Sequence, residues 1–356
     1  MITDNHTVAS YFARAHLDNA VRLGGQESSI LNRAGLTRGL LQQMRSRVSA
    51  KQLATIVRAT WAASDDELMG LTTQKIKLGV FPLLANQLLH YKTLGEALQH
   101  TVTFYNLITD QMFYSLEQLG DQVHFSIIPK QALTLEKAPR GLPPKSLLIE
   151  YLLLVWHRFP SWLVGQVINL NKVTMQYPVP SHHQEYRLMF NCPCEYQSQS
   201  NTLVFDAEFL SLPIIQNSTE LEKYLTEIPL QWFRKQIFHD TCSAQVMRIL
   251  EESAPPMDTS LENIAQILHM TSRTLRRKLT AEGSGFQQLK DNARRDRAIN
   301  FFEDHSLSIS EIGRRLGYTE PATFTRAFKQ WTGVSPSAYR NYSSGNANQD
   351  SSTHKK

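Results

Sequence analysis

Apolar residues recur every three to four positions through the first hundred residues, as they do along one face of an α-helix. The pattern predicts a helix over 9–21 that ends before Gly24 and Gly25, with further helices around 53–61 and 94–105. The first part of the chain is therefore expected to be largely helical.

The period changes to two after residue 110. Residues 112–118 and 122–128 alternate apolar and polar side chains on either side of a turn at Gly120, which predicts a β-hairpin. Because helices and strands are interspersed, the first two-thirds of the chain are expected to form an α+β domain with several antiparallel strands. Further strands are expected at 172–177, 186–190 and 202–205.

The most apolar stretch, residues 146–170, is expected to contain a buried helix over about 144–165 that ends near Pro160. Glu150, His157 and Arg158 interrupt this stretch, so it is not expected to cross a bilayer. The first ten residues also lack the basic and apolar segments of a signal peptide. No membrane partner is therefore expected.

The cysteines favour a reducing compartment. Cys192, Cys194 and Cys242 are too few for a disulfide scaffold, which is typical of a cytoplasmic protein. The pair Cys192-Pro193-Cys194, with His182-His183 upstream, could indicate a metal site. A tetrahedral site normally has two or more residues between paired cysteines, so no bound metal is expected.

Charge is unevenly distributed along the chain. Residues 1–256 carry 22 basic and 22 acidic side chains, whereas residues 257–342 carry 13 basic and 9 acidic ones, within an overall charge of +5. Pro255-Pro256 and their small polar neighbours predict an extended linker at 251–260 between the two parts. A neutral body joined to a basic end is typical of a regulatory part linked to a part that contacts a polyanion.

The C-terminal third contains an internal repeat. Ile264-Ala265, followed by Leu268 and Thr271, recurs 48 residues later as Ile312-Gly313, followed by Leu316 and Thr319. Each copy is patterned as a short helix, a tight turn and a second helix that ends at glycine. This order predicts two helix-turn-helix units.

The second helix of the first copy is expected to have a cationic face. At about 100° per residue, Arg273, Arg276 and Arg277 lie within roughly 100° of one another, opposite the leucines that would bury the helix. Thr271 is a suitable N-cap. On a lone helix such a stripe is usually a solvated surface. Its recurrence in a repeat favours DNA, because arginine matches the edge of guanine bidentately.

The second copy has the same arrangement. Phe324 and Phe328 share an inner face with Trp331, whereas Ala322, Arg326 and Lys329 face away from it. Glu320-Pro321 opens this helix, since proline is tolerated in a first turn.

These motifs resemble a known DNA-binding domain. The sequences SRTLRRKL (272–279) and SISEIGRRLGYTEPATFTRAFKQWTGVSPSAYR (308–340) are similar to the AraC/XylS family of bacterial transcription regulators, across about 258–342. The resemblance implies two helix-turn-helix units joined by a long helix over about 286–304, with the two recognition helices in successive major grooves about 34 Å apart. It places base-reading positions at Arg273, Arg276 and Arg277, and at Pro321, Ala322, Thr325 and Arg326. Because proline and alanine replace polar residues of some members, the second unit is expected to read fewer bases.

The N-terminal two-thirds resemble the arabinose-binding-type regulatory domain of one branch of this family. The similar segments are HLDNAVRLGG (16–25), TLGEALQHTVTFYNLITD (93–110) and RLMFNCPCEYQSQSNTLVFDAEFLSLPI (187–214). The resemblance implies effector sensing or self-association, and it assigns neither the effector nor the residues that bind it.

Catalytic motifs are absent from the sequence. There is no G-x-S-x-G, G-x-x-x-x-G-K-[ST], H-E-x-x-H or G-x-G-x-x-G, so neither an enzyme nor a cofactor is expected. The aromatic residues at 104, 105, 113 and 114 could line a pocket, although such spacing more often marks a core.

We interpret the chain as an α+β regulatory or dimerisation domain (1–250), a linker (251–260), an all-α double helix-turn-helix domain (261–342) and a disordered tail (343–356). The predicted function is sequence-specific transcription regulation, with activation expected, in the cytoplasm and at the nucleoid. Expected partners are duplex DNA, RNA polymerase, a small effector and a second copy of the chain. The alternative is a non-specific architectural DNA-binding protein, against which the surplus of only four positive charges argues. The expected DNA contacts are Thr271, Ser272, Arg273, Arg276, Arg277, Ala322, Thr325, Arg326 and Lys329.

Overall fold

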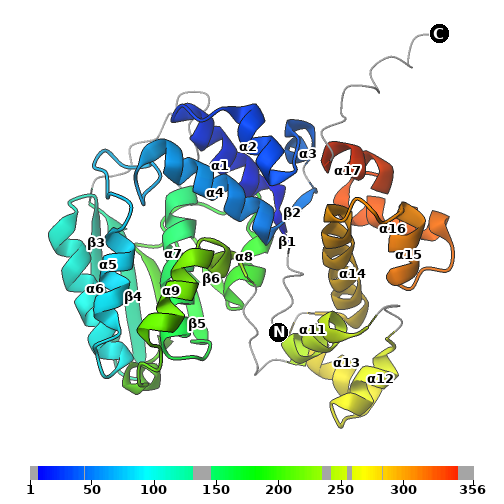
Figure 1. Ribbon diagram of the computed structural model, residues 1–356. Coiled ribbons are helices and arrows are strands. Elements are labelled where there is room, and N and C mark those ends of the chain that lie inside the picture. Colours follow the sequence, from blue (N-terminus) through cyan, green and yellow to red (C-terminus); the bar gives the residue numbers. More distant parts are fainter. Residues whose placement is uncertain are drawn as a thin grey trace. The chain divides into compact units, whose positions relative to one another are not determined.

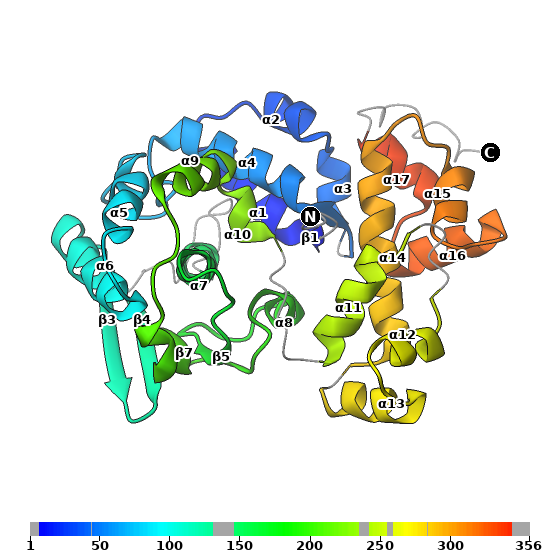
Figure 2. The same cartoon turned by 60° about the horizontal axis from the view of Figure 1, so that its bottom comes forward.

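The computed structural model describes residues 7–43, 45–130, 146–234, 242–254, 259–282 and 284–343 (Figures 1 and 2). The chain divides into two compact units, and each is described by itself. We call Ala15–Ile30 with Ala54–Gln236 the sheet unit, and Met1–Arg14, Leu31–Leu53 and Ile237–Lys356 the helical unit.

The sheet unit contains a five-stranded sheet in the order β3-β4-β7-β5-β6. All neighbouring strands are antiparallel except β5 and β6, which are parallel. The predicted hairpin is confirmed, because β3 and β4 are joined at the Leu119–Gln122 pair and Gly120 adopts the positive φ of +67° that this turn needs. The strands are β3 (Met112–Leu119), β4 (Gln122–Pro129), β5 (Leu170–Thr174), β6 (Cys194–Glu195) and β7 (Asn201–Asp206).

The strand predicted at 186–190 is wrong. These residues belong to helix α8 (Gln184–Phe190). Tyr186 and Phe190 are both buried, and their four-residue spacing places them on one face of a helix. In an isolated segment of five residues, strand and helix patterns of apolar side chains are easily confused.

Helix α7 (Ser146–Leu163) is the central element of the sheet unit. Its side chains are buried almost all round, and Figure 2 views it end-on between α9 and α10 on one side and β5 and β7 on the other. The helix continues for three residues beyond Pro160, so the proline lies in the last turn rather than after it. The other elements here are α5 (Val80–Leu88), α6 (Leu94–Ile108), the 3-10 helix Ala207–Ser211, α9 (Ser218–Glu227) and α10 (Leu230–Phe233).

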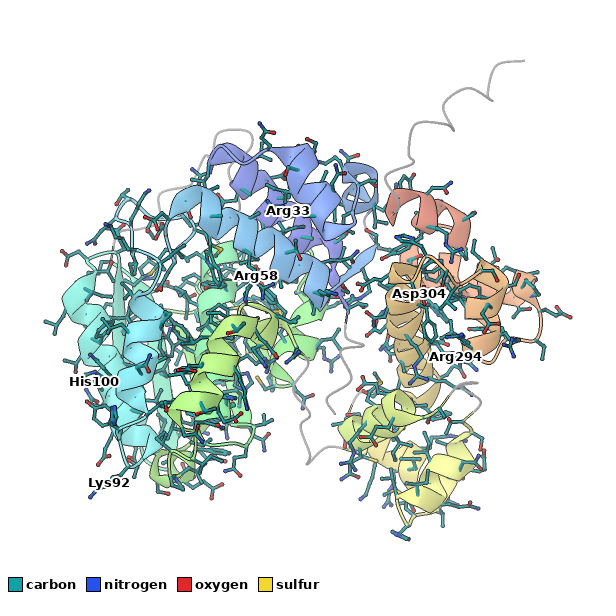
Figure 3. The ribbon with its side chains drawn as sticks, in the orientation of Figure 1. Arg33, Arg58, Lys92, His100, Arg294 and Asp304 are labelled. Atoms are coloured by element: carbon teal, nitrogen blue, oxygen red, sulfur yellow. The ribbon has the colours of Figure 1, made fainter. Side chains whose placement is uncertain are left out.

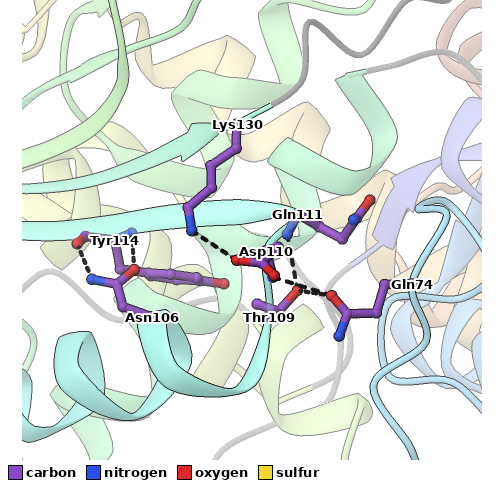
Figure 4. Close-up of polar contacts among 7 residues, drawn as sticks. All are labelled: Gln74, Asn106, Thr109, Asp110, Gln111, Tyr114 and Lys130. Carbon is purple, nitrogen blue, oxygen red and sulfur yellow. Dashed lines mark hydrogen bonds and ion pairs between the residues drawn. The ribbon is translucent and has the colours of Figure 1, made fainter.

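The end of α6 is tied to the start of β3 by side-chain amides (Figure 4). The Asn106 side chain donates to the carbonyl of Tyr114 at 2.8 Å and accepts from its N–H at 2.9 Å. Gln74 accepts from the Thr109 hydroxyl at 3.2 Å and from the Asp110 N–H at 3.1 Å, and Lys130 pairs with Asp110. These bonds hold Tyr114, whose ring stacks on Tyr105 with centroids 4.9 Å apart.

The helical unit is built around α14, with one helix pair at each end of it (Figure 1). One pair is α12 with α13, and the other is α15 with α16. Phe302 of α14 packs against Phe328 of α16 and Tyr339 of α17, with ring centroids 5.2 and 5.3 Å apart. The helices are α11 (Cys242–Glu252), α12 (Leu261–Ile267), α13 (Ser272–Ala281), α14 (Phe286–Glu303), α15 (Ile309–Arg315), α16 (Pro321–Thr332) and α17 (Pro336–Ser343).

Early segments of the chain belong to the helical unit. A short antiparallel ribbon of β1 (Thr7–Ala9) and β2 (Arg47–Ser49) contacts α14, and α3 (Arg38–Gln42) contacts α17. Helices α1 (Ser10–Arg22), α2 (Glu27–Ala34) and α4 (Ala50–Ser64) each contribute residues to both units.

This division differs from the domain boundaries expected from the sequence. Residues 7–14 and 31–53 pair with the C-terminal helices, and α11, which lies before the expected linker, packs on α13 and α14. Residues 255–258 of the expected linker and 344–356 of the expected tail lie outside the described residues. Within the described part of the chain, no helix has the length and apolar character required to cross a membrane.

Candidate nucleic-acid interface and a ligand cavity

Helix α13 has a buried apolar face and an exposed basic face. The hydroxyl of its N-cap residue Thr271 accepts the Thr274 N–H at 3.2 Å, which satisfies one of the free donors at the helix start. Leu275 and Leu279 are buried. The opposite face of the helix carries three arginines, all of them exposed: Arg273, Arg276 and Arg277.

The three guanidinium groups are available for a ligand. Among the described residues, none of them has a hydrogen-bond or ion-pair partner. Such groups carry their full positive charge and their donors toward solvent, in a planar arrangement that suits phosphate and guanine. Ser272, the first residue of α13, is half-buried beside them.

Helix α16 presents a smaller polar face. Ala322, Arg326 and Lys329 are exposed, whereas Phe324 and Phe328 are buried. Thr325 is half-buried, and its hydroxyl donates to the carbonyl of Pro321 at 3.0 Å, within its own helix. Arg326 makes a long 3.4 Å hydrogen bond to the hydroxyl of Thr323.

The turns between the paired helices have the same backbone shape. His269, between α12 and α13, has a φ of +53°, and Gly317, 48 residues later, has a φ of +84°. Both values lie in the left-handed region, which a tight turn uses to reverse the chain between helices. The repeat in the sequence is therefore also a repeat in the backbone.

Two contacts that sequence reasoning missed support the second unit. The guanidinium of Arg294, on α14, lies 4.9 Å from the ring centroid of Tyr318 (Arg294 is labelled in Figure 3). A Cβ atom at Gly313 would meet Phe324 at 3.2 Å, so the glycine permits a close approach of α15 and α16. The sequence repeat aligns Gly313 with Ala265, and the small residue at this position in both copies could have predicted the close helix contact.

The residues considered for a metal site make other contacts or lie at a strand. His182, considered as a metal ligand, is hydrogen-bonded to the buried carboxylate of Glu150 at 2.7 Å. Cys192 and Cys194 lie at a short strand, and no cluster of three potential metal ligands occurs in the described ranges of the chain.

A cavity of about 370 Å³ lies within the sheet unit and was not predicted as a site. Of the four aromatic positions considered from the sequence, Tyr105 lines the cavity. The other three do not line it: Tyr114 is buried, Phe104 is half-buried and Phe113 is exposed. The lining comes from α4, α6, α7, the start of α5 with the segment before it, and the chain from α9 to α10. Because these segments are distant in sequence, only the density of aromatic residues could have indicated the cavity.

Two helix pairs, each with an exposed basic second helix and an apolar inner face, define a helix-turn-helix DNA-binding protein. Comparison with known proteins agrees with this class. Residues 24–214 match the family described as the arabinose-binding domain of AraC transcription regulator, N-term, and residues 264–342 match the helix-turn-helix domain. The chain belongs to the AraC/XylS family of transcription regulators that have an arabinose-binding-type N-terminal domain.

Individual relatives are regulators as well. The chain is 25% identical over 339 residues to the ornithine utilization regulator of Pseudomonas aeruginosa, which covers 92% of this chain and 95% of that protein. It is 30% identical over 165 residues to the transcriptional regulator VqsM of the same species, covering 46% and 47% of the two chains. The solved structure of the regulator CdpR, also from Pseudomonas aeruginosa, is 24% identical, covers 72% of this chain and 80% of that one, and has a TM-score of 0.29.

Proposed function

We propose that this protein is a sequence-specific DNA-binding regulator that activates transcription, and that a small effector or self-association controls it through the N-terminal part. The observation that carries the proposal is the exposed basic face of α13, where three arginines have no partner among the described residues. Residues 261–342 would bind DNA, and residues 1–250 would regulate this binding.

The chemistry of the two second helices supports base reading. In the major groove, Arg273, Arg276 and Arg277 would donate to guanine O6 and N7, while Thr271 and Ser272 would contact phosphate. On α16, Thr325 and Arg326 would read bases, Lys329 would contact phosphate, and Ala322 would pack against the DNA. With α14 between the helix pairs, the two helices would enter successive major grooves.

The proposal is tested with promoter DNA and the full chain. Arg276→Ala and Arg277→Ala are each expected to weaken specific binding by about 1–3 kcal/mol, because a bidentate base contact is lost. Lys278→Ala is the matched control, since it removes one exposed charge from the same helix outside the arginine face. If the arginine variants bind promoter DNA as tightly as the lysine variant does, the assignment of base contacts is wrong.

An architectural role would appear in the same assay. A non-specific protein would bind promoter and unrelated fragments equally, and rising salt would weaken both to the same extent. A sequence-specific regulator is expected to keep a preference for the promoter as salt rises, because base contacts release no counterions.

Activation is tested by transcription in vitro with RNA polymerase. The family resemblance supports activation, which would require contact between the promoter-bound protein and the polymerase. An increase in transcript on addition of the full chain is expected, and it should be lost in the Arg276→Ala variant. A decrease in transcript would instead make the protein a repressor.

Sedimentation of the full chain across a range of concentrations would test whether it forms a homodimer.

A further inference from the structure

The cavity of the sheet unit is walled by aromatic rings. Trp232 packs edge-to-face against Trp61, Phe81 and Tyr151, with centroids 5.9, 5.4 and 5.6 Å apart. Tyr105 packs in the same manner against Trp156 at 5.6 Å. Aromatic rings have negative faces, so a cavity lined by several of them favours a positively charged guest. The six rings of the wall are Trp61, Phe81, Tyr105, Tyr151, Trp156 and Trp232.

One carboxylate is built into this wall. Glu67 Oε1 accepts the Gly79 N–H at 3.0 Å and the Phe81 N–H at 2.8 Å, and Oε2 lies 3.0 Å from the same Phe81 nitrogen. These bonds to the start of α5 fix the side chain in place. A carboxylate has about four lone-pair positions, so Glu67 keeps the capacity to accept from a ligand.

The charge of Glu67 is not balanced within the described protein. No described lysine, arginine or histidine lies within ion-pair distance of it. Arg58 is the only basic residue among the described lining, and its guanidinium donates to the carbonyls of Ile228 and Glu227, both at 3.1 Å (Arg58 is labelled in Figure 3). Partial burial raises the pKa of Glu67 to about 7, despite the two N–H donors.

Other polar groups of the lining also lack partners. The buried indole N–H of Trp61 has no hydrogen-bond partner among the described residues. The hydroxyls of Tyr105 and Tyr151 have no recorded hydrogen bond within the same part of the chain, and burial keeps the pKa of both well above its ordinary value. A ligand in the cavity could therefore meet both donors and an acceptor.

The geometry points to a binding site for a small organic cation, an amine or a quaternary ammonium on an apolar body, with its charge against Glu67 and its body among the aromatic rings. A cavity of about 370 Å³ is in the size range of small-molecule sites. An acidic ligand is disfavoured, because it would place a second carboxylate beside Glu67 in an apolar cavity. This inference rests on the proposed function, in which the N-terminal part senses an effector.

The test uses the full chain without DNA and follows the fluorescence of the tryptophans in the cavity wall. The probes are benzyltrimethylammonium, its neutral carbon isostere neopentylbenzene, and benzylamine. The quaternary probe is expected to bind at least about ten-fold more tightly than the isostere, as a cation over aromatic faces and beside a carboxylate should. Tighter binding of benzylamine than of the quaternary probe would also support a cation site and would show that it prefers primary amines to quaternary ammonium groups.

Glu67→Gln is expected to abolish the preference for the charged probe while leaving the affinity for neopentylbenzene unchanged. The unchanged neutral affinity shows that the variant still folds with its cavity intact. Glu117→Gln is the matched control, because it removes one exposed carboxylate of the same unit and should leave both affinities unaltered. Equal binding of the charged and neutral probes by the unmodified chain, or no saturable binding of either cation, overturns the inference.

The pH dependence provides a second readout. Glu67 carries its charge only above its pKa of about 7, so the affinity for the permanently charged probe should rise between pH 6 and pH 8. The hydroxyls of Tyr105 and Tyr151 stay neutral between pH 6 and pH 8, because burial raises the pKa of both, so they do not contribute to this rise in affinity. The other carboxylate near Glu67 is Asp66, which is bonded to the backbone: it accepts the N–H groups of Leu68, Gly70 and Ile76.

The rise with pH should be absent in Glu67→Gln. Promoter binding by the same variant, measured without probe, should stay at the level of the unmodified chain. A failure of the cavity inference is therefore distinguishable from a failure of DNA binding.

Discussion

A single backbone position shows how the two helix-turn-helix units share a shape with different residues. The turn of the second unit uses Gly317 at a φ of +84°, whereas the first unit places His269 at a φ of +53°. A side chain in the left-handed region meets the following carbonyl, at a cost of about 1–2 kcal/mol. The backbone of the first unit is therefore strained at His269, whereas Gly317 adopts the same region in the second unit without this strain.

This difference predicts the effect of adding a Cβ atom to the second turn. Gly317→Ala is expected to lower the free energy of unfolding by about 1 kcal/mol, measured by chemical denaturation. Gly317→Asn is the control and should lose less, because asparagine tolerates the left-handed region better than alanine does. An alanine variant as stable as the unmodified chain would contradict the role assigned to this turn.

At the scale of the element, the recognition helix depends on its first turn. Helix α13 has ten residues, and such a short helix is marginal without tertiary contacts and a cap. Thr271 supplies the cap through its hydroxyl, and Leu275 and Leu279 supply the buried face. The arginines are presented only while this helix is formed.

Removing the cap should destabilise the helix. Thr271→Ala is expected to cost about 1 kcal/mol in the free energy of unfolding, measured without DNA, since an orphan N–H at the helix start loses its acceptor. Thr271→Ser keeps a hydroxyl and should restore most of this loss. Equal destabilisation by alanine and serine would indicate that the methyl group, rather than the cap, matters.

At the scale of the whole helical unit, a buried polar cluster joins residues from opposite ends of the chain. The hydroxyl of Thr7 donates to Asp296 Oδ1 at 2.5 Å, and Arg295 pairs with the same carboxylate at 2.9 Å. Arg47 donates to Thr7 at 2.9 Å, and its own carbonyl accepts from the Tyr339 hydroxyl at 2.9 Å. The ribbon β1–β2 is thus joined to α14 by the Thr7–Asp296 hydrogen bond and to α17 by the hydrogen bond from Tyr339.

Loss of the central carboxylate should be costly. Asp296→Ala is expected to lower the free energy of unfolding by about 3 kcal/mol, because it leaves the half-buried Arg295 guanidinium and the buried Thr7 hydroxyl without this acceptor. Asp291→Ala, on the same helix and less buried, is the control and should cost well under 1 kcal/mol. Denaturation with circular dichroism as the signal would compare the two, and equal stabilities would show that the cluster contributes little.

Local periodicity predicted the elements whose partners lie nearby. The β3–β4 hairpin, the long buried helix and the exposure of Arg273, Arg276 and Arg277 follow from side-chain spacing over a few residues. Residues 186–190 were predicted incorrectly as a strand, because five residues do not separate the two periods, and burial of Tyr186 and Phe190 decided for a helix. The three-residue strands β1 and β2 are too short to leave a pattern.

The sequence by itself determined the two helix-turn-helix units, their basic faces and the family, because these depend on residues close together in the chain. The tertiary structure alone decided that residues 7–14 and 31–53 pack with the C-terminal helices, and that Glu67 meets a ring of aromatic side chains from distant segments. The physical reason is that a cavity and a buried charge cluster are properties of how elements pack. Their energies come from desolvation and contacts between residues that no local pattern relates.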